Sequence, residues 1–329
     1  MRHIDVFNGD ADGLCALRQL RLAEPVPAEL VTGPKRDIEL VRRVSAAAGD
    51  EVTVLDVDFD RNRKAVLALL EAGVRVRYFA HHGHPKLPSH PLLDAHVSSS
   101  RGLCTSLLVD RHLAGRHGAW AVVGAFGDGM AIAATERATA LLLDTARLRT
   151  LRELGETLNY NAYGESEADL FIAPAALYRV LERYDDQFEA ARDDATLVSL
   201  AEQRRADLEA VRSAAPLRTT DRWDVYVLPN QAWSRRVSGV FANRLAFREP
   251  RRVHAVLTHA PRGGFRISVR TPSYNVLSAG DFCRQFPGGG GRAGAGGVDH
   301  LDERDLDSFI GRLDAVFAGG PINAPRTTP

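Results

Sequence analysis

Short apolar runs alternate with longer amphipathic stretches through the first half of the chain. Apolar residues recur at helical spacing in residues 14–20, 37–47 and 61–72, and Asp60 is the expected N-cap of the last of these helices. The apolar runs between them predict strands at residues 4–7, 52–56, 74–79 and 120–123. Strands that alternate with helices in this way predict a mostly parallel sheet covered on both faces.

The pattern changes after residue 186. A polar, helix-prone stretch ends before Pro216, and expected strands follow at residues 224–228, 253–258 and 265–270. The chain continues with a short helix at 279–285, the glycine-rich segment FPGGGGRAGAGG and an amphipathic helix at 302–317. The predicted architecture is α/β throughout, with an N-terminal domain (1–186), a helical connector (187–218), a smaller α/β domain (219–317) and a disordered tail (318–329).

Composition narrows the class of protein and of ligand. With 329 residues and 45% hydrophobic content, the chain can bury two moderate cores. Acidic and basic residues balance at 42 each, which argues against a surface that binds long nucleic acid through its backbone and favours a small or short anionic ligand. The start of the chain does not resemble a signal peptide, and no apolar run reaches membrane-spanning length. We therefore expect a cytoplasmic protein without a membrane partner, and a homodimer is one possible assembly.

An acidic turn follows the first expected strand. In VFNGDADGL the residues Asn8, Asp10, Asp12 and Gly13 match the opening of the calcium-loop pattern. The closing position is Gln19, which has no carboxylate, and a strand precedes the turn in place of a helix. A strand, an acidic turn and a helix instead favour the mouth of an open α/β sheet, where ligands bind beyond the carboxyl ends of the strands.

Other expected strands also end in polar residues. Asp56 closes the strand in VTVLDVDFD, and Asp128 follows the apolar run in VVGAFGDGMA. His81 and His82 follow the strand in VRYFAHHGHP. Together with the acidic turn, these residues provide the carboxylate and imidazole donors that suit Mn²⁺ or a similar divalent ion. One shared carboxylate can hold two ions about 3.5–4 Å apart for attack on phosphorus.

The order of these motifs resembles one known family. NGDADG, LDVD, HH and GDG, followed by ISVRT at residues 267–271 and by the glycine-rich segment, are similar to the motifs of the DHH phosphoesterase superfamily. The resemblance is to the branch with a C-terminal DHH-associated domain, found in nanoRNases, cyclic-dinucleotide phosphodiesterases and the bacterial single-strand 5′ exonuclease, and it spans about residues 2–317. It implies a hydrolase of short oligonucleotides, or of cyclic or linear dinucleotides, that releases nucleoside 5′-monophosphates.

The resemblance also implies a metal-binding set. It places one ion at Asp10 and Asp56, and a second at Asp12, Asp56, His81 and Asp128. Asp56 bridges the two ions in this arrangement. Mn²⁺ is the expected ion, with Mg²⁺ and Co²⁺ as alternatives.

Further residues are implied to bind substrate. The resemblance makes His82 a catalytic residue, beside Asp56, that faces the substrate phosphate. It also implies that a terminal phosphate is held from across an interdomain cleft by Arg270, Gly289, Gly290, Gly291 and Arg292. Consecutive glycines let backbone N–H groups approach an anion, and a guanidinium can bind phosphate through two hydrogen bonds.

Three positions depart from the family motifs. Asn8 replaces the histidine of the first motif, and it is a weaker ligand because an amide oxygen binds transition metals less well than imidazole. Arg292 replaces the histidine of the last motif and keeps an anion-binding donor. Ala80 replaces the aspartate of D-H-H, and losing a carboxylate beside metal-binding imidazoles typically costs about 10–100-fold in metal affinity or activity.

Ala80 leaves two hypotheses about activity. Either the alanine is natural and the chain is a weakened enzyme or a nucleotide-binding protein, or it is an introduced substitution that disables an otherwise competent enzyme. A nucleotide phosphomonoesterase of the same superfamily is a further alternative, since these residues do not distinguish the two kinds of phosphate ester.

Overall fold

The computed structural model describes residues 1–83, 85–100, 102–272 and 277–317. The chain divides into an N-terminal unit, Met1–Arg204, and a C-terminal unit, Arg205–Pro329. The division falls inside the predicted helical connector. The predicted C-terminal tail lies outside the described residues.

The N-terminal unit is built on a parallel sheet whose described strands follow the order β2-β1-β3-β4-β5. The strands are β1 (His3–Asn8), β2 (Ala28–Gly33), β3 (Glu51–Leu55), β4 (Arg75–Ala80) and β5 (Leu93–Val97). The three central strands are mostly apolar and mostly buried, as expected of strands covered on both faces, and the predicted parallel α/β sheet is confirmed. The edge strands β2 and β5 are only partly buried, and their mixed sequences did not predict them.

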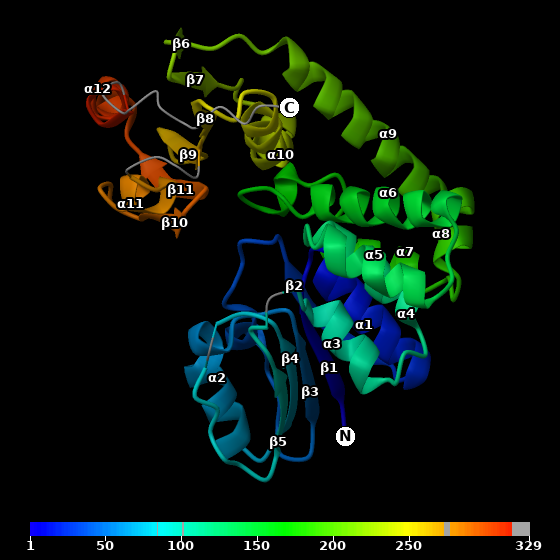
Figure 1. Ribbon diagram of the computed structural model, residues 1–329. Coiled ribbons are helices and arrows are strands. Elements are labelled where there is room, and N and C mark those ends of the chain that lie inside the picture. The colour runs from blue at the N-terminus through cyan, green and yellow to red at the C-terminus, as the bar shows by residue number, and fades with distance from the viewer. Residues whose placement is uncertain (84, 101, 273–276, 318–329) are drawn as a thin grey trace. The chain divides into compact units, whose positions relative to one another are not determined.

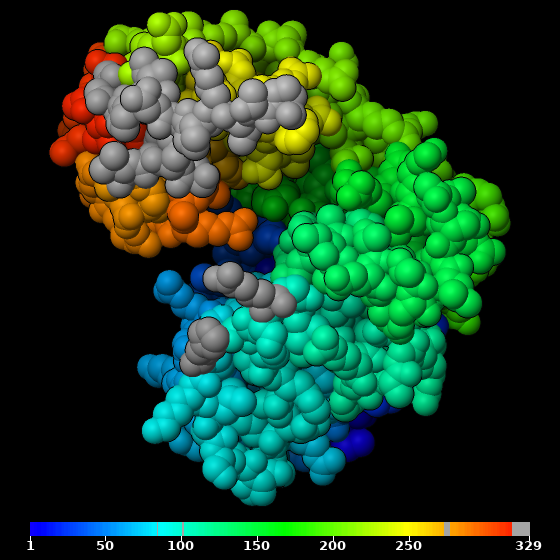
Figure 2. All heavy atoms as spheres, viewed as in Figure 1, coloured from blue at the N-terminus to red at the C-terminus, as the bar shows by residue number. Residues whose placement is uncertain are grey.

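Helices cover both faces of this sheet. Helix α2 lies on one face, and α1 and α3 lie on the other (Figure 1). The helices are α1 (Ala11–Ala23), α2 (Phe59–Glu71), α3 (Thr105–His112), α4 (Gly118–Gly127), α5 (Ala131–Ala140), α6 (Thr145–Asn161), α7 (Pro174–Leu181), α8 (Gln187–Asp193) and α9 (Ala195–Ala210), with 3₁₀ turns η1 (Leu40–Arg43) and η2 (Glu167–Asp169). Little of β1 and α1, coloured dark blue, is visible at the surface in Figure 2, which agrees with the burial of α1 from Ala11 to Arg21.

Several predicted elements were wrong. Residues 120–123 belong to helix α4 and not to a strand: α4 is apolar on all sides and almost wholly buried, so its sequence carries no helical period. Residues 37–47 form only the short turn η1. Asp58, and not Asp60, caps α2, since its side chain accepts a hydrogen bond from the Arg61 N–H at 2.9 Å.

The predicted long helix at 187–215 is broken at Asp194. The carboxylate of Asp194 accepts hydrogen bonds from the N–H groups of Thr196 and Leu197, at 2.9 and 3.1 Å, and so caps the start of α9. The stretch therefore contains two helices, α8 and α9, followed by the 3₁₀ turn η3 (Val211–Ser213).

Glycines allow α4 to pack closely between α1 and α6. A Cβ atom at Gly127 would lie 2.2 Å from the Cβ of Ala11, and one at Gly155 would lie 2.2 Å from the carbonyl oxygen of Val123. Such distances are far below van der Waals contact, so neither position accepts a side chain without movement of the helices. The contact at Gly127 brings the end of α4, with Asp128, beside the start of α1.

The C-terminal unit contains a mixed sheet with the order β10-β11-β9-β8-β7-β6 among its described strands. Its elements are β6 (Arg218–Thr219), β7 (Trp223–Val227), α10 (Ala232–Arg248), β8 (Val253–His259), β9 (Phe265–Arg270), α11 (Ala279–Cys283), β10 (Gly289–Arg292), β11 (Ala295–Leu301), the 3₁₀ turn η4 (Glu303–Asp305) and α12 (Leu306–Phe317). Helix α10 covers one face of the sheet, and α11 and α12 pack on the other (Figure 1). In the glycine-rich segment, Gly289–Gly291 pair with β11 as part of strand β10.

No helix within the described ranges is both long enough and apolar enough to cross a membrane.

Replacing glycine by alanine should change the free energy of unfolding in opposite directions at two helical glycines, because only one of them lies where α4 and α6 pack closely. Gly155→Ala should destabilise the protein by about 1–3 kcal/mol because the added methyl meets the backbone of α4. Gly239→Ala, in the interior of α10, adds a methyl with no atom within 4 Å and should be neutral or stabilising by up to about 1 kcal/mol. Urea unfolding of the full chain measures both, and equal effects would contradict the close contact at Gly155.

Candidate metal centre

Polar side chains gather at the carboxyl edge of the parallel sheet. Asp10 and Asp12 follow β1, Asp56 follows β3, and His81 and His82 follow β4. Since the three strands are parallel neighbours, their ends meet at one edge. Asp128 joins them from the C-terminal end of α4, a helix and not the strand that the sequence predicted.

His81 lies at the centre of three carboxylates. Its Nε2 atom is 3.3 Å from Asp56 Oδ1, 3.6 Å from Asp128 Oδ2 and 3.7 Å from Asp12 Oδ2. The same Nε2 atom is buried and makes no hydrogen bond within the described part of the chain. Two overlapping sets of donors are close enough to share an ion: Asp12, His81 and Asp128, and also Asp56, His81 and His82.

This donor set fits a divalent metal ion. A buried imidazole nitrogen without a hydrogen bond, facing carboxylate oxygens, is the nitrogen and oxygen environment that suits Mn²⁺ and related ions. Burial disfavours the charged ring of His81, but Asp56, Asp12 and Asp128 outweigh burial and raise its pKa to about 9. Because a metal binds the neutral ring, ion binding at His81 releases a proton.

The first turn of α3 fixes Asp12. Its Oδ1 accepts a hydrogen bond from the Ser106 N–H and its Oδ2 accepts one from the Thr105 N–H, both at 2.8 Å. These N–H groups have no partner within the helix, and a carboxylate satisfies them. Burial, and then the charge of Asp56, nevertheless raise the pKa of Asp12. The sequence did not predict Thr105 or Ser106 as part of the site, because backbone donors leave no sequence signature.

Asp56 is held in an unusual backbone conformation. Its φ angle is 58°, in the left-handed region, which costs a residue other than glycine energy, although aspartate tolerates it better than most. Its Oδ1 atom accepts a hydrogen bond from the Thr105 hydroxyl at 2.8 Å and lies 3.1 Å from His82 Nε2. Burial alone would raise the pKa of Asp56, but His81 and His82 outweigh it, and the pKa is lowered.

Asp10 has a different environment. Its Oδ1 caps α1 by accepting hydrogen bonds from the N–H groups of Asp12 and Gly13, both at 3.1 Å. Its Oδ2 accepts a hydrogen bond from Lys35 Nζ at 2.5 Å, and Lys35 Nζ also lies 3.3 Å from Asp128 Oδ1. Lys35 was not among the predicted site residues. The feature that could have identified it is its place two residues after β2, a strand that ends at the same edge of the sheet.

Asn8 and Ala80 depart from the family motifs in different surroundings. The Asn8 side chain, predicted as a weak metal ligand, donates a hydrogen bond to the Lys35 carbonyl at 3.1 Å and accepts one from the Asp10 N–H at 3.2 Å. Ala80 ends β4, is fully buried and belongs to an apolar cluster with Tyr78 and Val57. A carboxylate at position 80 would therefore enter a largely apolar layer.

The predicted phosphate-binding residues lie in the C-terminal unit. Arg270 on β9 is in register with Ala295 on β11, which is in turn in register with Arg292 on β10. The two arginines thus stand in one row across three strands, on the same face of the sheet. The Arg270 Nε donates a hydrogen bond to Asn243 Oδ1, on α10, at 2.7 Å.

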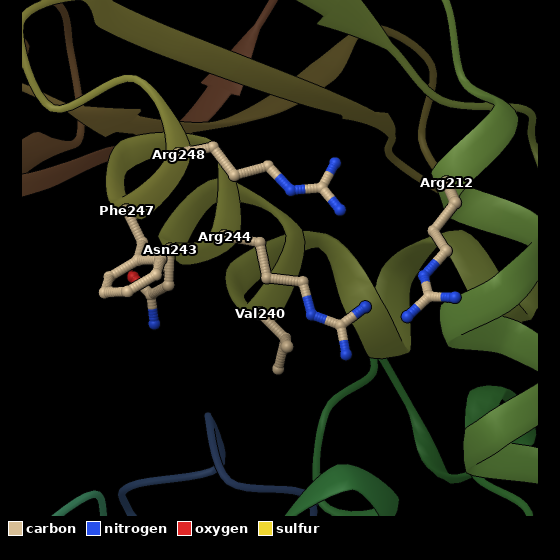
Figure 3. Close-up of a pocket in the computed structure, with 6 residues that line it drawn as sticks. All are labelled: Arg212, Val240, Asn243, Arg244, Phe247 and Arg248. Atoms are coloured by element: carbon tan, nitrogen blue, oxygen red, sulfur yellow. The ribbon is translucent and has the colours of Figure 1, made fainter.

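Asn243 also lines a basic pocket. The pocket has a volume of about 340 Å³ and is lined by Arg212, Val240, Asn243, Arg244, Phe247 and Arg248. Figure 3 shows the guanidinium groups of the three arginines extending toward the same space. Phe247, which also lines the pocket, is 88% exposed. No acidic residue is among these lining residues, but Arg212 forms an ion pair with Glu209 at 2.6 Å.

Known structures share this fold, although no protein-family model and no curated protein matches the sequence. A RecJ exonuclease bound to manganese is similar over 97% of this chain and 91% of its own, with a TM-score of 0.65 and 20% identity. RecJ from Thermus thermophilus in complex with Mn²⁺ gives the same TM-score and identity over 97% of this chain and 52% of its own, so the chain spans about half the length of that protein. RecJ is a member of the DHH superfamily. The chain has the fold of these RecJ structures.

A second DHH protein is similar over a comparable length. PggH, a pGpG-specific phosphodiesterase from Vibrio cholerae, matches with a TM-score of 0.52 and 13% identity over 96% of this chain and 98% of its own. At these identities the similarity concerns the fold alone. The shared fold accounts for the parallel sheet and for the second α/β unit.

If Asp128 is a ligand of this candidate metal centre, Asp128→Asn should weaken Mn²⁺ binding about tenfold or more, since it removes an anionic donor while leaving the shape of the side chain. The matched control is Asp60→Asn, an exposed aspartate in the first turn of α2 that pairs with Arg63 and should not alter binding. Isothermal titration calorimetry measures both. An unchanged affinity in Asp128→Asn would exclude Asp128 from the centre.

Proposed function

We propose that this chain is a divalent-metal-dependent phosphodiesterase that hydrolyses short oligonucleotides, or cyclic or linear dinucleotides, to nucleoside 5′-monophosphates. The observation that carries the proposal is the buried His81 Nε2 atom, which has no hydrogen bond to the described residues and faces three carboxylates. The DHH fold supports it, because the structures similar to this chain include an exonuclease bound to manganese and a phosphodiesterase. We place the reaction in the cytoplasm.

The residues that would hold the ion are Asp12, Asp56, His81 and Asp128. Mn²⁺ is the ion we propose, with Mg²⁺ and Co²⁺ as alternatives. A bound ion of this kind lowers the pKa of water and polarises a phosphoryl oxygen. The predicted second ion, shared through Asp56, requires Asp10 as a ligand.

The side chains around the centre have distinct tasks. The N–H groups of α3 and the Thr105 hydroxyl orient the carboxylates of Asp12 and Asp56. His82 lies beside Asp56 with 39% of its side chain exposed, so it can contact both that carboxylate and a substrate phosphate. We propose this contact as its catalytic role.

The C-terminal unit would bind the nucleotide. Arg270 and Arg292 stand in one row and provide guanidinium donors for a phosphate, and the glycines of β10, Gly289–Gly291, add backbone groups beside them. The basic pocket reached through Asn243 adds three arginines for phosphate, and its exposed Phe247 offers a face on which a base can stack. An anionic substrate that also carries bases matches this combination.

A second candidate function is a nucleotide-binding protein that retains the fold without efficient hydrolysis. Ala80 and the hydrogen-bonded Asn8 favour it, because both remove groups that the DHH motifs place beside the metal. A nucleotide phosphomonoesterase would use the same centre and differ only in substrate.

The test of the main proposal compares this chain with Ala80→Asp in Mn²⁺-dependent hydrolysis of a 5′-phosphorylated dinucleotide. The DHH motif has a carboxylate at this position, beside the metal-binding imidazoles. If the new carboxylate reaches those imidazoles from its apolar surroundings, turnover should rise about 10–100-fold. Product is measured by chromatography, and folding by circular dichroism, since the new carboxylate is buried. Hydrolysis by neither chain, with Mn²⁺ bound to both, would favour the nucleotide-binding protein.

The phosphate role of Arg270 has its own test. Arg270→Ala should raise KM for the dinucleotide about tenfold or more, because a charged hydrogen-bond donor to the phosphate is lost, and should leave Mn²⁺ affinity unchanged. Arg266→Ala is the matched control, on the same strand and the same face of the sheet. Steady-state kinetics measures KM, and equal KM values in the two variants would remove Arg270 from the substrate site.

A further inference from the structure

The carboxylate of Asp10 already forms an ion pair with the ammonium group of Lys35. We propose that the ammonium group of Lys35 takes the position beside Asp10 that the DHH motifs assign to the first metal ion, so that this chain binds one divalent ion, at Asp12, Asp56, His81 and Asp128. The inference rests on the metal centre of the proposed function and changes its composition. Lys35 is thereby a positioning residue that supplies fixed positive charge.

Both oxygens of Asp10 are engaged. Oδ1 accepts two backbone N–H groups at the start of α1, and Oδ2 accepts the Lys35 ammonium at 2.5 Å. A divalent ion at Asp10 would have to displace the ammonium or lie in contact with it, and two cations that share one carboxylate repel each other. The donors at Asp10 therefore do not fit a second ion, in contrast to the donors around His81.

Asn8 explains why the ammonium lies there. The DHH motif has a histidine at this position, which would provide a nitrogen ligand for the first ion. The asparagine instead donates its side-chain N–H to the Lys35 carbonyl at 3.1 Å, and so helps to hold the backbone of Lys35 against the acidic turn. Asn8 therefore both removes the histidine ligand and helps to anchor Lys35.

Other contacts hold Lys35 in the same place. Its backbone N–H donates to the Ala162 carbonyl at 2.9 Å, and its Nζ lies 5.9 Å from the centre of the Tyr163 ring. Nζ also lies 3.3 Å from Asp128 Oδ1, so the ammonium lies between the two carboxylates. Only 30% of the side chain is exposed. These backbone, ionic and aromatic contacts fix the position of Lys35 within the site.

The charge in the site supports one ion in place of two. Asp10, Asp12 and Asp56 are almost fully buried, and buried carboxylates require compensating cations. Beside Asp10, the compensating positive charge comes from Lys35. Around His81, the Nε2 atom makes no hydrogen bond to a described residue, so a metal ion can bind there.

The test is the number of Mn²⁺ ions bound per chain, from calorimetric titration, together with the electron paramagnetic resonance spectrum of the loaded protein. We expect one ion per chain and the spectrum of an isolated Mn²⁺. The double variant Asn8→His with Lys35→Met restores the ligand and removes the ammonium, so it should bind two ions with a spin-coupled spectrum. Lys64→Met, an exposed lysine on α2, is the control and should bind one.

Two coupled ions in the unaltered chain would overturn the inference, as would a double variant that folds normally and still binds one. The outcome is independent of turnover. One bound ion without hydrolysis of any phosphodiester contradicts the proposed reaction and leaves the inference intact. A chain that binds no Mn²⁺ contradicts the inference and the metal-dependent function together.

Discussion

The burial of several carboxylates at one edge of a parallel sheet is the constraint on which the N-terminal unit depends. Asp10, Asp12 and Asp56 are withdrawn from water almost completely, and such burial is costly unless each charge is paired or hydrogen-bonded. These carboxylates are paired or hydrogen-bonded by the N–H groups of α3, the ammonium of Lys35 and the imidazoles after β4. Each of these groups comes from a different segment, so the site holds distant parts of the chain together.

The sequence predicted the central part of the fold well, for a physical reason. The strands β1, β3 and β4 are mostly buried, so apolar residues predominate in them and polar residues follow directly after, and both features are visible in the sequence. The edge strands β2 and β5 are only partly buried and lack that contrast. Helix α4 is apolar on every side, which removes the period that distinguishes a helix from a strand.

The site was predictable only where a side chain carries the chemistry. The acidic residues and histidines that meet at the sheet edge were all candidates, because their side chains are metal ligands and the family motifs order them. Lys35 was missed because its role depends on a strand that the sequence did not reveal, and Thr105 was missed because its N–H group acts through the backbone.

The glycine-rich segment illustrates the same limit in the C-terminal unit. Four consecutive glycines favour a mobile loop when they are judged from sequence, yet residues 289–291 lie in a strand. A Cβ atom at Gly289 would lie 1.8 Å from the Cys283 carbonyl, and one at Gly291 would lie 2.5 Å from the Ala295 carbonyl. The glycines are needed because backbone approaches backbone at this point, which a sequence does not reveal.

Because Asp128 comes from a helix, the metal centre also affects how the helical layer is held against the sheet. The other acidic donors follow strands of the sheet, while Asp128 ends α4, whose distance from α1 is set by the contact between Gly127 and Ala11. An ion held by both groups of donors would act as a cross-link between the sheet and the helical layer, and would close a long loop of the chain in the way that a disulfide does. Local opening of α4 away from α1 would then require the ion to leave, so occupancy of the centre and the rigidity of this helix pair would rise and fall together.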